Sequence, residues 1–90
     1  MSEFRVTFGQ RFRHEHHPAF IAGQLDFEPD PDGWLTIVAE YESEARATAV
    51  ALLGQAWAFL YRAPFDDDWD QMYPLGELAA AYRVTVERAT

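Results

Sequence analysis

The residues best suited to chemistry lie in a histidine-rich stretch near the N-terminus, Arg13-His14-Glu15-His16-His17. On an extended backbone, His14 and His16 project to the same side about 7 Å apart. Imidazole nitrogens are common metal ligands, and a carboxylate could complete a site. Two-residue spacing is weak evidence, because the helical motif with two histidines four residues apart is missing. We interpret the stretch as a polar loop and keep a metal site as an alternative.

A second candidate is an acidic stretch whose carboxylates follow the spacing of an EF-hand calcium loop. The first, third, fifth and twelfth positions are Asp66, Asp68, Asp70 and Glu77. Two other positions disagree with that motif, since Gln71 stands where glycine is needed and Pro74 lies in the later half. We therefore expect an acidic surface loop. The alternative metal site would combine His14 and His16 with the loop from Asp66 to Asp70.

Other routes to catalysis have little support in the sequence. The serines are Ser2 and Ser43, and there is no cysteine, so no activated nucleophile is apparent. Neither Gly9-Gln10 nor Gly54-Gln55 resembles a phosphate-binding loop. We predict a chain that has no catalytic residues and needs no cofactor.

Composition narrows the class of protein further. The length of ninety residues predicts one domain, over residues 1–90. The formal net charge of -8 predicts that this domain binds phosphate backbones poorly. The absence of cysteine favours the cytoplasm, and no signal peptide or membrane-spanning run is visible. Direct binding of nucleic acid or membrane is not expected. An acidic mimic of DNA stays an alternative, although the arginines near the N-terminus argue against it.

Three segments in the middle of the chain organise the expected fold. Gly33 to Glu40 is β-branched and aromatic, which predicts a central strand. Ser43 to Leu53 has alanines and leucines at helical spacing, with Ser43 as the expected N-cap and Gly54 as the stop. Ala56 to Tyr61 is predicted to be a second strand, parallel to the first through a right-handed crossover.

The flanking segments predict two further strands. Phe4 to Phe8 alternates with a period of two, and Tyr82 to Arg88 does the same at the other end. Prolines keep most of residues 14–32 from forming a helix, and Leu75 to Ala81 is expected to form one or two helical turns. The predicted fold is α+β, a mixed four-stranded sheet with one helix on one face, in the order strand, strand, helix, strand, strand.

Several short motifs occur in a fixed order: Thr7-Phe8-Gly9-Gln10, His17-Pro18, Asp32-Gly33-Trp34, Leu53-Gly54 before Trp57-Ala58-Phe59 and Tyr61, and Tyr73-Pro74-Leu75-Gly76-Glu77-Leu78. In this pattern, residues 7–78 resemble a group of small uncharacterised proteins of actinobacteria and their phages. The resemblance implies a phage or mobile-element setting, and it brings no known activity.

The function expected from these features is non-catalytic protein binding. The partner would be a host protein, or a second copy of the chain in a homodimer. Trp69 among aspartates would be either an exposed anchor or a side chain that folds back over the sheet edge. The residues predicted to contact a partner are Arg11, Arg13, His14, His17, Asp67, Trp69 and Asp70.

Overall fold

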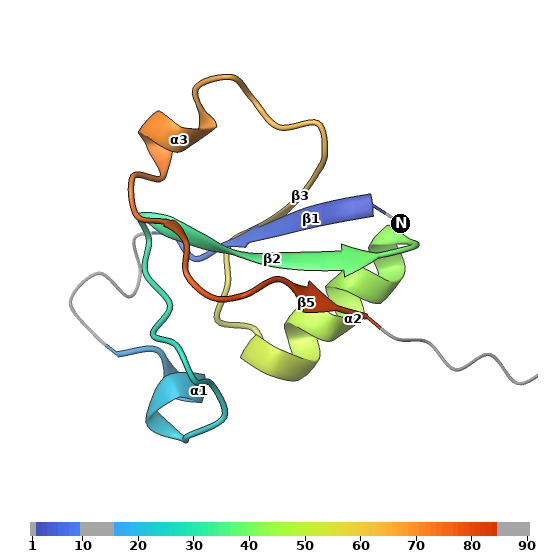
Figure 1. Ribbon diagram of the computed structural model, residues 1–90. Coiled ribbons are helices and arrows are strands. Elements are labelled where there is room, and N and C mark those ends of the chain that lie inside the picture. Colours follow the sequence, from blue (N-terminus) through green and yellow to red (C-terminus); the bar gives the residue numbers. More distant parts are fainter. Residues whose placement is uncertain (1, 10–15, 85–90) are drawn as a thin grey trace, which may run out of the picture.

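A computed structural model describes residues 2–9 and 16–84 of the chain (Figure 1). Its elements are β1 (Ser2–Thr7), α1 (Pro18–Ile21), β2 (Gly33–Ala39), α2 (Glu42–Leu53), β3 (Phe59–Arg62), α3 (Trp69–Met72), β4 (Gly76–Glu77) and β5 (Tyr82–Arg83). The predicted α+β class is confirmed, but the sheet has five strands rather than four, because Gly76–Glu77 forms a strand that was not predicted. Within the described residues, no helix is long and apolar enough to cross a membrane.

The sheet has the strand order β3-β1-β2-β4, and β5 also pairs with β2. β1 is antiparallel to both β2 and β3, so these two strands run parallel on either side of it. The predicted parallel direction is therefore correct, and the N-terminal strand lies between the two. β4 and β5 both run parallel to β2 along its other edge.

The strands β1 and β2 form the centre of the sheet and are covered on both faces. Phe4, Val6 and Phe8 are buried on the face predicted from the alternation. On the opposite face of β1, Thr7 is buried and Arg5 is half-buried. In Figure 1, α2 lies below the sheet and the segment that carries α3 lies above it. A two-layer α/β arrangement thus gains a third layer of irregular chain.

The N-cap of α2 is Tyr41 rather than the predicted Ser43, so the helix starts two residues earlier. The Tyr41 N–H donates to the Glu44 carboxylate over 3.1 Å, so the third helical residue satisfies the capping position. Ser43 lies inside the first turn, where its hydroxyl has no capping function. Gly54 ends the helix as predicted, with φ 65°, in the left-handed region that suits glycine.

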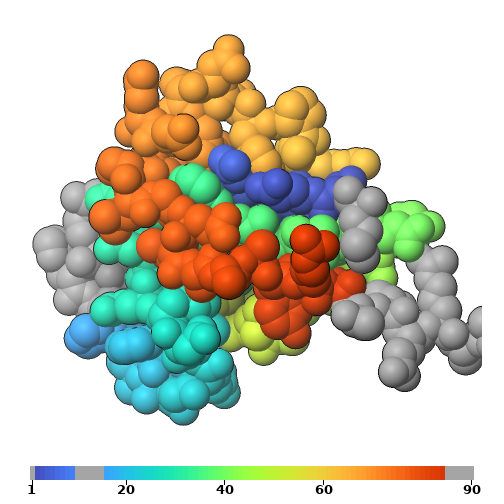
Figure 2. Space-filling view, viewed as in Figure 1, coloured from blue at the N-terminus to red at the C-terminus, as the bar shows by residue number. Residues whose placement is uncertain are grey.

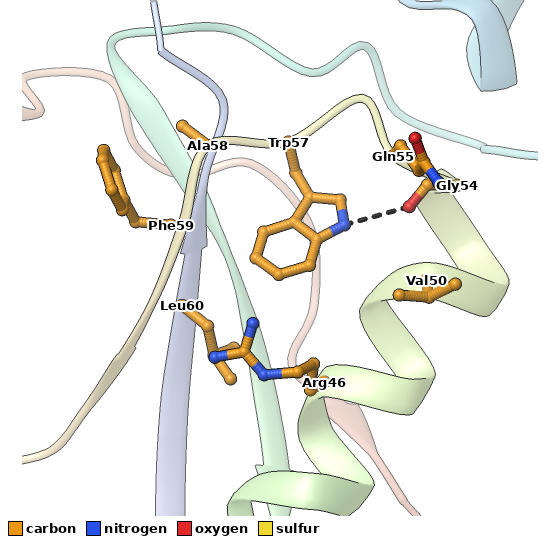
Figure 3. Close-up of a pocket in the computed structure, with 8 residues that line it drawn as sticks. All are labelled: Arg46, Val50, Gly54, Gln55, Trp57, Ala58, Phe59 and Leu60. Atoms are coloured by element: carbon orange, nitrogen blue, oxygen red, sulfur yellow. Dashed lines mark hydrogen bonds between the residues drawn. The ribbon is translucent and has the colours of Figure 1, made fainter.

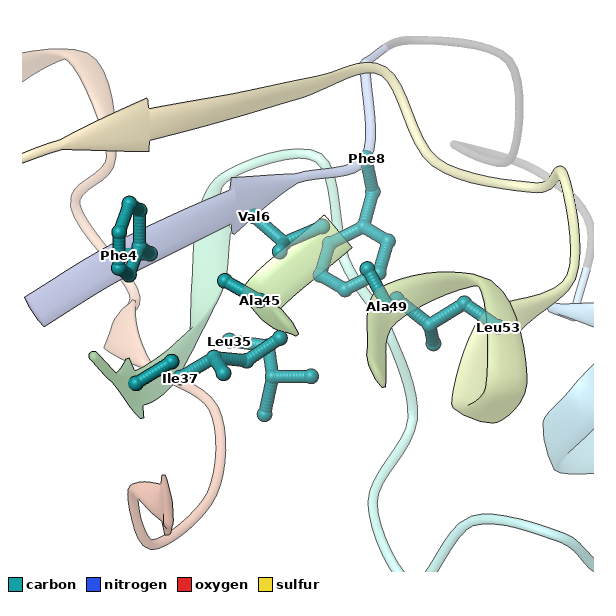
Figure 4. Close-up of a cluster of buried hydrophobic side chains, with 9 residues drawn as sticks. Phe4, Val6, Phe8, Leu35, Ile37, Ala45, Ala49 and Leu53 are labelled. Atoms are coloured by element: carbon teal, nitrogen blue, oxygen red, sulfur yellow. The ribbon is translucent and has the colours of Figure 1, made fainter. Parts of the chain in front are cut away.

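The main core lies between α2 and the sheet (Figure 4). The helix contributes Ala45, Ala49 and Leu53, all buried. The two alanines let the helix approach the sheet closely. From the sheet come Phe4, Val6, Phe8, Leu35, Ile37 and Ala39. Ala47 and Ala51 are exposed on the far side of the helix.

The prediction of helical turns from Leu75 to Ala81 is wrong, because the backbone of this segment pairs with β2 instead. Gly76 and Glu77 form β4, and the Leu78 N–H donates to the Trp34 carbonyl oxygen over 3.0 Å. Gly76 has φ 73°, a value that an α-helix does not allow. The predicted last strand is confirmed at Tyr82–Arg83, and its continuation beyond residue 84 lies outside the described residues.

The helix α1 is a single turn within the stretch that the prolines were expected to keep irregular. Pro18 occupies its first turn, where an N–H has no partner within the helix and its loss costs nothing. Proline therefore begins this turn instead of preventing it. Ala19 is its buried residue, while Phe20 and Ile21 are exposed.

The contact between α2 and the sheet gives a matched pair of substitutions. Ala49 is fully buried against the core, so Ala49→Leu should overpack it and lower the free energy of unfolding by about 1–3 kcal/mol. Ala47→Leu adds the same atoms to the exposed side and should change stability by less than about 0.5 kcal/mol. Urea denaturation of both variants measures the difference, and equal losses would contradict the packing described.

Candidate functional site

The structure separates the residues that were predicted to contact a partner. Arg11, Arg13 and His14 lie outside the described residues. Asp67 and Asp70 are exposed, whereas His17 and Trp69 are buried. The described members therefore do not form one surface, and the two buried side chains are not available to a partner in this conformation.

His17 is fully buried and connects α1 to the segment before β3. Its Nδ1 accepts a hydrogen bond from the Ala19 N–H at 3.0 Å, which caps the start of α1. Its Nε2 therefore carries the proton, and lies 2.6 Å from the Ala56 carbonyl oxygen that accepts it. The ring also contacts Phe8 edge-on, with centroids 6.0 Å apart. This histidine has a structural role that its chemical type alone did not reveal.

The remaining described histidine, His16, is exposed and pairs with the Glu28 carboxylate. The aspartates whose spacing was compared with a calcium loop lie in or just before α3, on the opposite side of the sheet from α1 (Figure 1). Glu77 has left that loop for β4, where its Oε2 accepts a hydrogen bond from Thr36 Oγ1 at 3.2 Å. Over residues 2–9 and 16–84, no group of three or more His, Asp or Glu side chains could hold a metal ion.

Trp69 is only 4% exposed and lies on the face of the sheet opposite α2. Of the two alternatives for this residue, the structure shows the one in which it folds back over the sheet. Its ring lies 4.5 Å from Tyr73 and 5.2 Å from Tyr61, measured between centroids. Trp34 and Phe65 lie 5.8 and 5.4 Å away. We call these five rings the aromatic cluster.

The aromatic cluster surrounds the guanidinium group of Arg5. The Cζ atom of Arg5 lies 3.9 Å from the Phe65 centroid, 4.4 Å from Trp34 and 5.2 Å from Trp69. Such contacts between a cation and aromatic faces contribute about 0.5–2 kcal/mol each when partly desolvated. An aromatic cage could bind a cationic ligand, but here the chain's own arginine fills it. The cluster is therefore a second core rather than a ligand site.

Polar contacts hold two rings of the aromatic cluster in place. Trp34 Nε1 donates to Thr36 Oγ1 over 3.0 Å. The Tyr73 hydroxyl interacts with Thr7 and Tyr61. Burial raises the pKa of Tyr73 above its ordinary value of 10.0, and the nearby Tyr61 hydroxyl raises it further. Tyr73 is thus held as the neutral phenol in the folded protein.

The edge of the sheet formed by β3 is open. β3 pairs with β1 on one side, and none of the described elements pairs with its other side. The Ala63 N–H donates to the Glu3 carbonyl oxygen at 3.1 Å, so Ala63 directs its backbone groups toward β1. Every second residue back along β3 does the same: Tyr61 is paired with Arg5, and Phe59 with Thr7. Because paired residues alternate along an antiparallel strand, the N–H and C=O groups of Leu60 and Arg62 point outward.

Side chains on both faces of β3 extend this open edge. On the face away from α2, Phe59 is 63% exposed and Tyr61 is 37% exposed. On the α2 face, a groove of about 350 Å³ separates β3 from the helix (Figure 3). The Trp57 indole lies within it, with its Nε1 donating to the Gly54 carbonyl oxygen at 3.0 Å. The groove is lined by Arg46, Val50, Gly54, Gln55, Trp57, Ala58, Phe59 and Leu60.

The local charge at this edge differs from that of the whole chain. The groove and β3 contain no carboxylate, although the chain has fifteen acidic residues. They contain two cations, Arg46 and Arg62. Arg46 lies 5.7 Å from the Trp57 ring centroid and pairs with Glu42 one turn earlier at 3.8 Å. The edge is therefore a weakly basic and largely apolar strip on an acidic protein.

The space-filling view shows how much of the remaining surface is formed by irregular chain. In Figure 2, the segment after β3 covers the top of the molecule and the segment around α1 covers the bottom. Between them lies the segment that carries β4 and β5, against the edge of β2. The β2 edge is thus occupied by the chain itself, which distinguishes it from the β3 edge.

Sequence reasoning missed the features that define the aromatic cluster and the open edge at β3. Arg5 was visible only as a polar residue in an alternating strand, and nothing local identified its aromatic neighbours. The alternation of the strand predicted from Ala56 to Tyr61 would place Trp57 on the same face as Phe59 and Tyr61. In the structure, Trp57 lies in the groove on the α2 side and the other two lie on the opposite face. The Ala58 N–H donates to Thr7 just before β3 begins, which places Trp57 outside the strand alternation.

Comparison of the chain with protein-family models, with curated proteins and with solved structures found no match. The function must therefore be inferred from the geometry of residues 2–9 and 16–84.

The burial of Trp69 predicts its role in stability. Trp69→Ala should lower the free energy of unfolding by about 3–5 kcal/mol, because it removes the central ring of the aromatic cluster. Phe59→Ala, at an exposed position, should cost less than about 1 kcal/mol. Thermal or urea denaturation compares them. A stability loss for Trp69→Ala as small as that for Phe59→Ala would restore the exposed-anchor alternative.

The raised pKa of Tyr73 predicts a dependence of stability on alkaline pH. Below pH 10 the phenol is protonated in both folded and unfolded chains, so its contribution is fully present. Above that pH the unfolded chain loses the proton first, and the free energy of unfolding should fall. Tyr73→Phe should show a shallower fall between neutral and alkaline pH, and Tyr82→Phe, at an exposed position, should keep the wild-type slope. Equal slopes in all three proteins would contradict the assignment.

Proposed function

We propose that the protein is a non-catalytic protein-binding module that takes an extended segment of a partner as an additional strand on β3. The observation that carries this proposal is the open edge at Leu60 and Arg62. Two N–H and two C=O groups there point outward in the plane of the sheet, on the side away from β1. Strand addition of this kind uses main-chain hydrogen bonds for affinity and flanking pockets for side-chain selection.

The surroundings of β3 fit a bound strand on both faces. Alternate side chains of such a strand would point to opposite faces of the sheet. One set would enter the groove beside Trp57, Val50 and Leu60, and the other would cover Phe59 and Tyr61. Natural edges are commonly protected by short length, charged side chains, proline or a covering element. The four residues of Phe59–Arg62 include no proline, and their one charged residue is Arg62.

The predicted phage or mobile-element setting belongs to this proposal and rests on the resemblance alone. A small acidic protein that adds a strand to a host protein would suit that setting. Binding through exposed Asp67 and Asp70 stays a prediction, as does the DNA-mimic alternative. Neither has a structural feature in the described residues as specific as the β3 edge.

The test separates the backbone of Arg62 from its side chain. Arg62→Pro removes the outward N–H and keeps an extended backbone, while Arg62→Ala removes the charge and keeps the N–H. Peptides selected from a displayed random library on the wild-type protein should bind Arg62→Ala within about tenfold of wild type. They should bind Arg62→Pro at least about tenfold more weakly, as measured by calorimetry.

Two controls complete this experiment. Circular dichroism and denaturation should show that both variants fold, since Arg62 is exposed and its N–H lies on the unpaired side of β3. Amide resonances of Leu60 and Arg62 should shift when a selected peptide is added. Peptides that bind Arg62→Pro as tightly as Arg62→Ala would show that the β3 edge is not the binding site.

A further inference from the structure

We infer that β3 of a second copy of this chain occupies the open edge, antiparallel to the first, so that the two sheets join into one. This inference rests on the proposed function and names the occupant of the same site. It gives a homodimer with a twofold axis through the middle of the two β3 strands.

The backbone pattern of β3 is complementary to itself. Each copy presents the outward N–H and C=O groups of Leu60 and Arg62. In an antiparallel pair, Leu60 of one copy can exchange both hydrogen bonds with Arg62 of the other. The twofold axis repeats this pair, which gives four hydrogen bonds and uses every outward group of the two residues. Tyr61 then faces Tyr61 of the second copy on the axis.

The side chains agree with this register. Phe59 and Tyr61 share the face away from α2, and the partner strand would cover the exposed part of both rings. Aromatic pairs across strands are favourable neighbours in antiparallel sheets. On the α2 face, the grooves of the two copies would meet above the joined strands. Each groove is about 350 Å³ and contains the Trp57 side chain, so their junction forms one larger apolar surface.

The edge of each copy is free of carboxylates. β3 and the groove contain two cations, Arg46 and Arg62, although the chain has a net charge of -8. The absence of carboxylates from β3 and the groove lets two acidic molecules approach at this edge.

Sedimentation equilibrium over a range of protein concentrations tests the inference. The wild-type protein should form a dimer. Arg62→Ala should dimerise within about tenfold of the wild-type Kd, whereas Arg62→Pro should weaken the dimer by at least about a hundredfold. Because each chain carries a net charge of -8, added salt should strengthen the dimer by screening the repulsion between copies. A monomeric wild type, or an Arg62→Pro variant that dimerises like Arg62→Ala, would overturn the inference.

Single cysteines test the register, since the chain has no cysteine of its own. In the inferred dimer, the two copies of residue 61 face each other at about 4.5–5.5 Å between Cβ atoms, within disulfide range after mild oxidation. Tyr61→Cys should therefore form a covalent dimer. The two copies of residue 59 lie about 13 Å apart along the strands, so Phe59→Cys should not cross-link efficiently. Equal cross-linking of both variants would overturn the register.

The two proposals fail in different ways. A monomeric wild-type protein that still binds selected peptides, and loses them on Arg62→Pro substitution, would remove the second copy as the occupant and keep the β3 edge as a binding site. If Arg62→Pro changes neither dimerisation nor peptide binding, the β3 edge is not a binding site.

Discussion

The structure depends on one constraint, which is that the β1–β2 pair must be covered on both faces. β2 carries apolar or aromatic residues on both sides, and β1 has buried Thr7 and half-buried Arg5 on the side opposite Phe4 and Val6. The helix α2 covers one face only. The segment after β3 covers the other. Its Trp69 lies at the centre of the aromatic cluster, and its backbone returns along β2 as β4. A chain of this size can bury both faces only because loop residues act as core.

Covering the second face determines where binding can occur. The aromatic cluster buries Trp69, which the sequence offered as a possible anchor, and Arg5 lies among its rings. His17 is likewise used internally, where it joins α1 to the segment before β3. The chemically distinctive side chains of the described residues therefore serve folding. What remains open is a strand edge, and an edge recognises backbone rather than a particular functional group.

Local patterns predicted the elements whose apolar spacing or end signals lie within the segment itself. The alternation of Phe4, Val6 and Phe8, the helical spacing of Ala45 and Ala49 and the stop at Gly54 all gave correct predictions. One error arose where a distant segment supplied the partner. Leu75 to Ala81 has helix-forming residues, yet β2 pairs with the backbone there. The other error was local, because Pro18 was interpreted as a helix breaker, whereas the cap provided by His17 made it the first residue of a turn.

The sequence by itself determined the α+β class, the central strand–helix–strand unit and the acidic charge, because these follow from the period of apolar residues and from composition. The tertiary structure alone decided that Trp69 is buried beside Arg5, that β1 lies between β2 and β3, and that β3 forms an edge of the sheet. Strand order and cross-sheet contacts join residues some 30 to 70 positions apart, as Arg5 and Trp69 show. No periodicity in one segment specifies which distant segment will pair with it.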